Sequence, residues 1–416
     1  MLARGEYKGR GMKFGCLAAV LLTFAASGFA AEAKEAVSLT FQMNYSHDGN
    51  TSIKGFKPPL KVLWKTDLSG NHSSQVTGFP IIVNNKVYVV SATDSVVKLF
   101  ALDIAGGAIL WKKTVPQGLQ QTAAIAYDNG RVFVINSKGL LQAYNADDGS
   151  VQWSHQLPGQ VPYTTSAPLA ADGFLFLSAN IDGGGHFYNF DQATGDVLWD
   201  NFVDDGGADN TIAAYGHGGV FVSYTCNYYK FDPVTGHKLW ADFTGGYGGG
   251  GDTPVLEGNR YYVRDRACTA GPGRILNAKN GNILGSFTTV VIPSFWRDKK
   301  GNALEIGRKF EDPYVFAFDP KTGKVPWKFA GDGGIEIPTI VIGNYVVAAS
   351  STGMVYLLDG KSGRQKYSLD IGSGGMTAMG AGDGALIVSA DDSVVAVVPD
   401  TGGNARRPAM LTRARH

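Results

Sequence analysis

Histidine and cysteine, the residues that most often build metal and redox sites, are scarce in this chain. Its 416 residues include seven histidines and three cysteines. No two histidines have the H-x-H or H-x-x-x-H spacing of a zinc site, and no two cysteines are adjacent. The sequence also lacks a P-loop and a G-x-S-x-G motif. It therefore has no motif for zinc binding, phosphate binding or a nucleophilic serine.

Charge is sparse as well. Charged residues make up 18% of the chain, hydrophobic residues make up 44%, and the formal net charge is +1. This balance gives no electrostatic support for a nucleic-acid partner. Beyond the first thirty residues no window has the pattern of a long amphipathic helix, whereas glycine is abundant, at 56 residues. Many short strands joined by glycine-rich turns, an all-β fold, fit this composition.

The longest apolar run lies near the N-terminus. Residues 17–30 (LAAVLLTFAASGFA) follow Lys13, and small residues after them allow cleavage after Ala30 or after Ala33. We interpret residues 1–33 as a secretory signal peptide, with Met12 as an alternative start. The mature protein is then expected in the periplasm or outside the cell, without a membrane-spanning segment. Residues 34–59 are expected to form an extended lead-in, and residues 404–416 a basic C-terminal tail.

The tryptophans are nearly periodic. Successive positions of the period are 40 to 47 residues apart, which is typical of an array of equal supersecondary units. Six positions hold Trp64, Trp111, Trp153, Trp199, Trp240 and Trp327. Gly285 and Tyr367 hold the other two positions, and only Trp296 is out of phase.

A turn precedes each of the last seven positions. Eight residues before them stands Asp or Asn, and four residues after that stands Gly, as in FDQATGDVLW, FDPVTGHKLW and FDPKTGKVPW. Asp and Asn start turns by bonding nearby backbone, and Gly accepts a positive φ without a steric penalty. Apolar segments flank the turn on both sides. The pattern therefore predicts the last hairpin of a repeating unit, with the aromatic residue packed between neighbouring units.

Four-stranded units of this kind begin near Phe79, Ala123, Ala167, Ile212, Pro254, Ile292, Pro338 and Thr377. The eighth unit lacks its last strand, and the N-terminal segment LKVLWKTDL, which contains Trp64, is a last strand without a unit. Joining them closes a ring and removes its exposed edges. We therefore predict an eight-bladed β-propeller of four-stranded antiparallel blades over residues 60–403, closed by the N-terminal strand.

The repeat resembles the PQQ-like repeat of quinoprotein-type propellers, with its Asp-x-x-Thr-Gly-x-x-x-Trp core. The best matches are Asp191/Thr194/Gly195/Trp199, Asp232/Thr235/Gly236/Trp240 and Asp319/Thr322/Gly323/Trp327. This family contains quinone-dependent dehydrogenases and also cofactor-free BamB-like members. This chain has the length of one propeller behind a leader, and in this it resembles the second group. The resemblance implies a scaffold that binds another envelope or extracellular protein, with no cofactor and no catalytic residues.

The alternative is an oxidoreductase or electron-transfer partner that holds a quinone (PQQ) or a metal at the mouth of the channel. The resemblance implies that such enzymes carry adjacent cysteines over the quinone and a carboxylate-bound calcium or lanthanide ion. In this chain the two cysteines of the mature part, Cys226 and Cys268, are 42 residues apart. They lie before the turns of neighbouring units, so a disulfide between them and two free thiols are both open.

Two further groups of residues are candidate ligand sites. Polar residues on the loops between blades would ring the mouth of the channel: Gln121, Thr165, Asn210, Asp252 and Glu336. Carboxylates in VDDGGADN suit a hard cation such as Ca²⁺: Asp204, Asp205 and Asp209. For both groups the favoured interpretation is solvated loop residues. The sequence does not indicate the oligomeric state.

Overall fold

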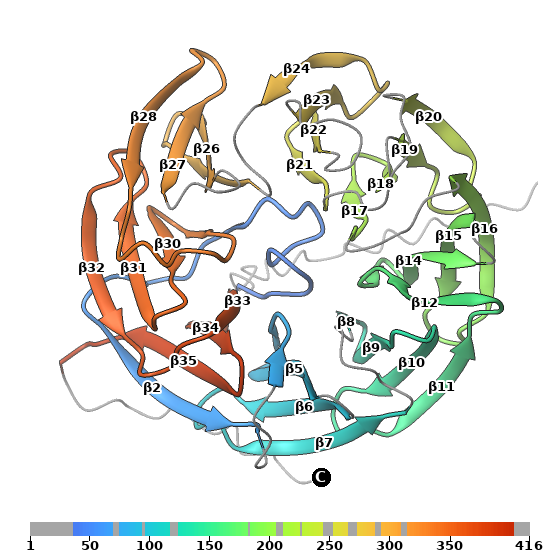
Figure 1. Ribbon diagram of the computed structural model, residues 1–416, viewed down its shortest axis with the longest axis horizontal. Helices are drawn as coiled ribbons and strands as arrows, with labels where there is room; N and C mark the ends of the chain where they lie inside the picture. The colour runs from blue at the N-terminus through green and yellow to red at the C-terminus, as the bar shows by residue number, and fades with distance from the viewer. Residues whose placement is uncertain are drawn as a thin grey trace, which may run out of the picture. The chain divides into compact units, whose positions relative to one another are not determined.

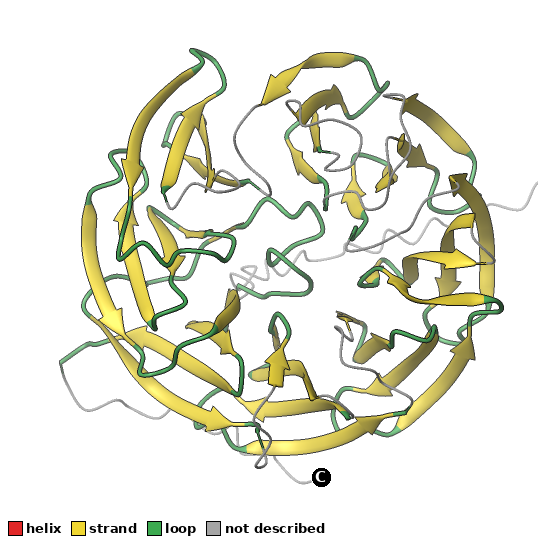
Figure 2. Ribbon diagram, viewed as in Figure 1, coloured by secondary structure: helices red, strands yellow, loops and turns green. Residues whose placement is uncertain are grey.

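The structure, a computed structural model, describes residues 36–69, 75–93, 96–116, 124–181, 184–204, 211–224, 227–243, 253–264, 273–287, 293–308 and 314–402. The chain from Glu35 onward forms one compact unit. Its described residues form strands and connecting turns with no helix, and hence no helix that could cross a membrane (Figure 2). Eight antiparallel sheets are arranged in a ring (Figure 1), which confirms the eight-bladed propeller.

The blades are numbered here in chain order, and each strand is given from the axis outward. Blade 1 contains β3 (Gln75–Thr77), β4 (Ile81–Val83), β5 (Lys86–Thr93), β6 (Val97–Asp103) and β7 (Ile109–Val115). Blade 2 contains β8 (Ala124–Asp128), β9 (Arg131–Ile135), β10 (Leu140–Asn145) and β11 (Val151–Gln156). Blade 3 contains β12 (Gln160–Thr165), β13 (Leu169–Ala171), β14 (Phe174–Ile181), β15 (Gly184–Asp191) and β16 (Val197–Asp204). Blade 4 contains β17 (Ala214–Gly216), β18 (Gly219–Tyr224), β19 (Asn227–Phe231) and β20 (Lys238–Phe243).

The second half of the ring repeats the plan. Blade 5 contains β21 (Val255–Glu257), β22 (Arg260–Val263), β23 (Gly273–Asn277) and β24 (Ile283–Phe287). Blade 6 contains β25 (Ser294–Arg297), β26 (Ala303–Arg308), β27 (Val315–Asp319) and β28 (Lys324–Phe329). Blade 7 contains β29 (Ile340–Ile342), β30 (Tyr345–Ala349), β31 (Met354–Asp359) and β32 (Gln365–Asp370), and β1 (Asn50–Thr51) adds to its inner edge. Blade 8 contains β33 (Met376–Gly382), β34 (Ala385–Ala390), β35 (Ser393–Pro399) and β2 (Leu60–Asp67).

The two ends of the ring meet in blade 8, as the sequence predicted. β2 pairs antiparallel with β35, with Leu60 opposite Pro399 and Asp67 opposite Ser393. The outermost strand of the last blade therefore comes from the start of the propeller. This pairing gives β35 its outer partner. Blade 8 is therefore complete, and the ring is closed.

Burial follows the position of each strand in its blade. Second strands are almost wholly buried, as in β18, because blades cover both of their faces. Fourth strands alternate, and in β7, β11 and β20 the side chains that remain partly covered face the next blade. The core is therefore a series of apolar layers between blades rather than one central cluster.

The tryptophans link each blade to the next. Every indole of the period donates a hydrogen bond from Nε1 to the carbonyl that follows the turn Asp or Asn of the next blade. The pairs are Trp64–Ile104, Trp111–Ala146, Trp153–Gln192, Trp199–Pro233, Trp240–Ala278 and Trp327–Gly360, at 2.7 to 3.4 Å. The ring face lies against the turn glycine, so a Cβ atom on Gly195 would stand 2.6 Å from Trp153. The turn glycine and the tryptophan of the preceding blade thus depend on each other.

The residues that break the tryptophan period make different contacts in the structure. Gly285 replaces the tryptophan of blade 5, and the turn glycine it would face, Gly323, has no heavy atom within 4 Å of its Cβ position. Tyr367 donates its hydroxyl to the carbonyl of Leu60 instead, at 2.9 Å. Trp296 lies on the first strand of blade 6 and packs against Gly360 of blade 7.

Candidate functional site: the axial channel and its N-terminal segment

The first strand of each blade lies nearest the axis, and one of its edges has no sheet partner within its own blade. An unpaired edge presents backbone N–H and C=O groups that need hydrogen bonds. In this ring, residues near the start of the described chain supply these hydrogen bonds. Residues 36–51, which we call the axial segment, run inside the ring, shown in blue at its centre in Figure 1. The sequence predicted an extended lead-in here, but residues 40–46 form turns, with positive φ at Gln42 and Met43.

The axial segment contacts the blades in ring order. Its backbone carbonyls accept hydrogen bonds from Asp383 (to Ala36), Ile82 (to Ser38), Tyr127 (to Leu39), Tyr215 (to Tyr45), Leu256 (to Ser46), Phe295 (to Asp48), Val341 (to Gly49) and Gly343 (to Thr51). These donors belong to blades 8, 1, 2, 4, 5, 6 and 7 in turn, at 2.7 to 3.4 Å. Beside blade 3, Phe41 packs edge-on against Phe79 and joins the cluster that contains Leu169.

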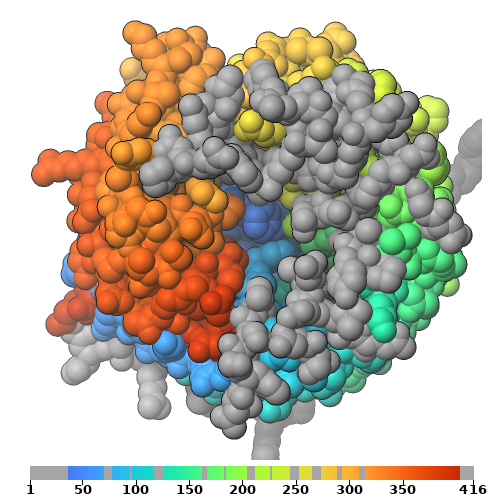
Figure 3. Space-filling view, in the orientation of Figure 1, coloured from blue at the N-terminus to red at the C-terminus, as the bar shows by residue number. Residues whose placement is uncertain are grey.

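These hydrogen bonds lie at one end of the channel. Ile82, Gly343 and Asp383 stand at or next to the turns that join first and second strands. The loops between blades lie at the other ends of the first strands. Blue atoms, which belong to the first residues that the structure describes, are visible deep in the central hollow in Figure 3. The axial segment therefore occupies the channel on the side of the first-to-second-strand turns.

His47 is the most deeply buried polar residue of the axial segment, with no exposed surface. Its Nδ1 lies 2.8 Å from the carbonyl of Phe41 within the segment, and its Nε2 lies 2.8 Å from the carbonyl of Ala213 in blade 4. Both partners are acceptors, so the charged imidazole, which carries two N–H donors, satisfies both contacts. Burial acts in the opposite direction and lowers the pKa of His47.

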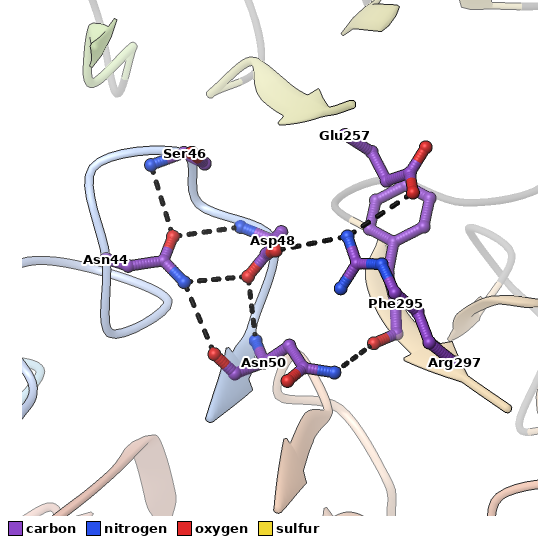
Figure 4. A network of polar contacts seen from close by, with 7 residues as sticks. All are labelled: Asn44, Ser46, Asp48, Asn50, Glu257, Phe295 and Arg297. Carbon is purple, nitrogen blue, oxygen red and sulfur yellow. Dashed lines mark hydrogen bonds and ion pairs between the residues drawn. The ribbon is translucent and has the colours of Figure 1, made fainter. Parts of the chain in front are cut away.

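A polar network fixes the second half of the axial segment (Figure 4). Asn44 donates to Asp48 Oδ1 at 2.7 Å, and Asn50 donates through Nδ2 to the carbonyl of Phe295 at 2.6 Å. Arg297 Nη2 lies 3.4 Å from Asp48 Oδ2 and 3.3 Å from Glu257 Oε1. One guanidinium thus connects the segment with blades 5 and 6, although both ion pairs are long and partly exposed.

A buried carboxyl lies close to this network. Glu305 of β26 has no exposed surface, and neither of its carboxyl oxygens has a hydrogen-bond partner. Burial raises the pKa of Glu305 to about 7, and nearby Glu257 adds to the rise, whereas Tyr262 and Arg260 oppose it. The folded protein therefore keeps this carboxyl protonated to a higher pH than a carboxyl in water.

Most of the candidate ligand residues lie outside the described part of the chain. This holds for Gln121, Asn210 and Asp252 of the predicted channel-mouth ring. Thr165 ends β12, and Glu336 is exposed just before β29. The ring of five residues stays a prediction.

The predicted cation site and the predicted disulfide also stay predictions. Asp204 is the last residue of β16, and Asp205, Asp209, Cys226 and Cys268 lie outside the described ranges. Among described residues no three His, Cys, Asp or Glu side chains group closely enough to hold a metal ion.

Sequence reasoning did not find the axial segment. It carries no repeat signal, and the hydrogen bonds that seat it come mainly from backbone carbonyls, which every residue has. Its one chemical signal is the dense polar stretch Asn44-Tyr-Ser-His-Asp-Gly-Asn50 in a region otherwise interpreted as a linker.

The ring of eight four-stranded blades, with each tryptophan placed on the next blade's Asp/Asn…Gly turn, defines a β-propeller of PQQ-like repeats. The family model described as outer membrane protein assembly factor BamB matches residues 98–214 and 311–405, which together make up just over half of the chain. The protein belongs to this family.

Curated relatives include both groups of the wider class. The chain is 33% identical over 129 residues to outer membrane protein assembly factor BamB of Yersinia pestis, a match that covers 29% of this chain and 32% of the relative. It is 32% identical over 164 residues to the dehydrogenase subunit of the quinone-type alcohol dehydrogenase of Gluconobacter oxydans, covering 35% of this chain and 21% of that protein. The matches thus span about a fifth and a third of these relatives' lengths.

Solved structures share the fold. The crystal structure of BamB from Moraxella catarrhalis superimposes with a TM-score of 0.61 at 15% identity, covering 83% of this chain and 99% of that one. At this identity the likeness concerns the architecture alone.

Proposed function

We propose that the protein is a periplasmic or secreted scaffold that binds another envelope protein. Membership of the BamB family supports this class of function. The binding surface we propose is the outer rim of blades 3 and 4. There two large aromatic side chains are mostly exposed: Phe202 on β16 (57%) and Phe243 on β20 (61%). Exposed aromatic residues of this size are typical anchors of protein interfaces.

The proposal rests on these two residues because their position in the repeat is polar in other blades. Both stand three positions after the tryptophan of their blade, and the same position holds Thr114 in blade 1 and Gln156 in blade 2. Leu198 and Leu239, which directly precede the tryptophans, are also about half exposed, but so are Leu110 and Leu284 at the same position of blades 1 and 5, so only the phenylalanines set blades 3 and 4 apart. Figure 1 shows β16 and β20 next to each other at the rim. Two neighbouring blades thus each expose a phenylalanine at a position that is polar in blades 1 and 2.

The test compares two double variants in the native host. Photo-crosslinkable groups placed beside the rim capture partners of the wild-type protein, of Phe202→Ser with Phe243→Ser, and of Thr114→Ser with Gln156→Ser. We expect a defined envelope protein to be captured by the wild type and by the blade 1–2 variant, and lost with the blade 3–4 variant. Equal capture by both variants would refute the surface, and capture of no envelope protein by the wild type would refute the scaffold.

The alternative function, a quinone- or metal-dependent oxidoreductase, has the Gluconobacter relative in its favour. One feature of the sequence weighs against it: the cysteines that the resemblance implies as an adjacent pair are 42 residues apart. The described residues also form no carboxylate cluster for its metal. Protein purified from its native source separates the two functions, since a quinone absorption band with stoichiometric Ca²⁺ would favour the enzyme over the scaffold.

A further inference from the structure

We propose that the inner edges of the blades form a binding site for a polypeptide, and that the axial segment, residues 36–51, is its resident ligand. The site differs from the outer rim proposed above and does not depend on the identity of any partner. It is built from backbone N–H groups of seven blades that point to the axis and meet carbonyls of one short stretch of chain.

Three observations separate a bound ligand from a loosely placed linker. First, part of the segment is buried as deeply as the core, since Ser38, Thr40 and Met43 are 1 to 2% exposed and His47 is fully buried, and none of its residues is classed as exposed. Second, it makes ladder contacts, because β1 pairs in parallel with β29, and Ser38 exchanges two hydrogen bonds with Ile82. Third, its side chains bond the ring directly, through His47 to Ala213 and Asn50 to Phe295.

Shape complementarity is clearest at Gly49. This residue has a φ of +62°, and a Cβ atom on it would lie 2.6 Å from Ser294 of blade 6 and 2.6 Å from Gln42. Gly55, just beyond the segment, has a φ of +78° and no heavy atom within 4 Å of its Cβ position. The two glycines therefore share a backbone conformation, but only Gly49 is packed against the ring.

The ring closes around this ligand. Seven blades share one short segment, so its departure would remove hydrogen bonds from every one of them at once. The segment also precedes β2, which closes the outer edge of blade 8. We infer that the axial segment holds the inner edges of the blades together, while β2 completes the outer edge of blade 8. The axial segment also fills this end of the channel, so that no other ligand can bind there.

The experiment converts the internal ligand into a free one without refolding. A site for a specific protease is inserted between Lys54 and Gly55, in an exposed turn, and the folded, leader-free protein is cut there. We expect the N-terminal fragment to stay bound through gel filtration. A fluorescent synthetic peptide of residues 36–54 should then exchange into the cut protein, and excess unlabelled peptide should compete with it.

A peptide with His47→Ala should compete about tenfold more weakly, as expected for the loss of a buried hydrogen bond worth about 1.4 kcal/mol. A scrambled peptide should not compete. Release of the fragment on cutting, without a fall in melting temperature and without rebinding of the labelled peptide, would overturn the proposal.

Two substitutions test the same site in the uncut chain. Gly49→Ala should lower the melting temperature clearly more than Gly55→Ala, because both introduce strain at positive φ but only the first meets the ring. Equal shifts would also overturn the proposal. If Gly49→Ala fails to fold while Gly55→Ala folds, the competition of a Gly49→Ala peptide decides, and binding equal to that of the unchanged peptide would contradict the packing described above.

Discussion

The turn glycines allow the docking of the tryptophans to be measured with a built-in control. Gly236 and Gly323 occupy the same position of the same Asp-x-x-Thr-Gly turn, with φ values of +70° and +69°. A Cβ atom on Gly236 would stand 2.8 Å from the Trp199 ring, whereas Gly323 faces open space because blade 5 has Gly285 in place of tryptophan. Alanine at either position therefore carries the same backbone strain, and only one substitution displaces an indole.

The expected costs follow from these two contributions. An alanine in the left-handed region costs about 1 kcal/mol, which should be the whole effect of Gly323→Ala. At Gly236 overpacking adds about 1–3 kcal/mol, because the ring cannot move away freely. The Trp199 indole also donates to the Pro233 carbonyl of that same turn at 2.9 Å, so retreat from the new methyl group would break a hydrogen bond.

Urea unfolding of both variants, followed by far-ultraviolet circular dichroism, measures the two free energies of unfolding. Gly236→Ala should lose about 2–4 kcal/mol and Gly323→Ala about 1 kcal/mol. Equal losses would show that the tryptophan does not press on the turn, and the account of blade-to-blade docking would then be wrong.

Three further outcomes are expected. Gly285→Trp should raise the free energy of unfolding by about 1 kcal/mol or more, since the new indole can reach the free turn of blade 6; a destabilised, folded variant in chemical denaturation would contradict this. Trp240→Ala should cost about 3 kcal/mol as an aromatic truncation, and an unchanged melting temperature would contradict it. Because the pKa of Glu305 is raised from 4.5 to about 7, its contribution is present at low pH and is lost as the pH rises through that window. Glu305→Gln should therefore reduce the fall in stability between pH 5 and pH 8 by up to about 3 kcal/mol, and parallel profiles of the two proteins would rule this out.

The sequence predicted the parts of the fold that are specified locally. Asp191 and Gly195 form their turn with groups a few residues apart, and the unit recurs often enough to reveal its strands. The split eighth blade was predictable because the segment of β2 keeps the tryptophan of the period, whereas the sequence has no fourth strand after the segment of β35. Glu305 could not be found in this way, because a carboxylate within an alternating segment has no local sign that its face of the strand is covered.

The axial segment escaped prediction for a different physical reason. Its partners are spread over seven blades, and most of the groups that bind it belong to the backbone, which leaves no pattern in the composition of those blades. Only the assembled ring brings the amides together around one axis. The segment therefore has almost no binding site until the ring exists, and the ring lacks partners for its inner edges until the segment arrives.

Because of this mutual dependence, the ring is closed in two places by one short stretch, residues 36–67. Residues 36–51 satisfy the inner edges, and β2, which begins nine residues later, pairs with β35 at nearly the other end of the sequence. Contacts so distant along the chain carry a high entropic cost before they form, so the N-terminal stretch should be the last part to become protected during folding. Pulsed hydrogen exchange checks this order: amides of β2 should gain protection after those of β18 and β30, and earlier protection of β2 would mean that the ends of the chain meet before the blades assemble.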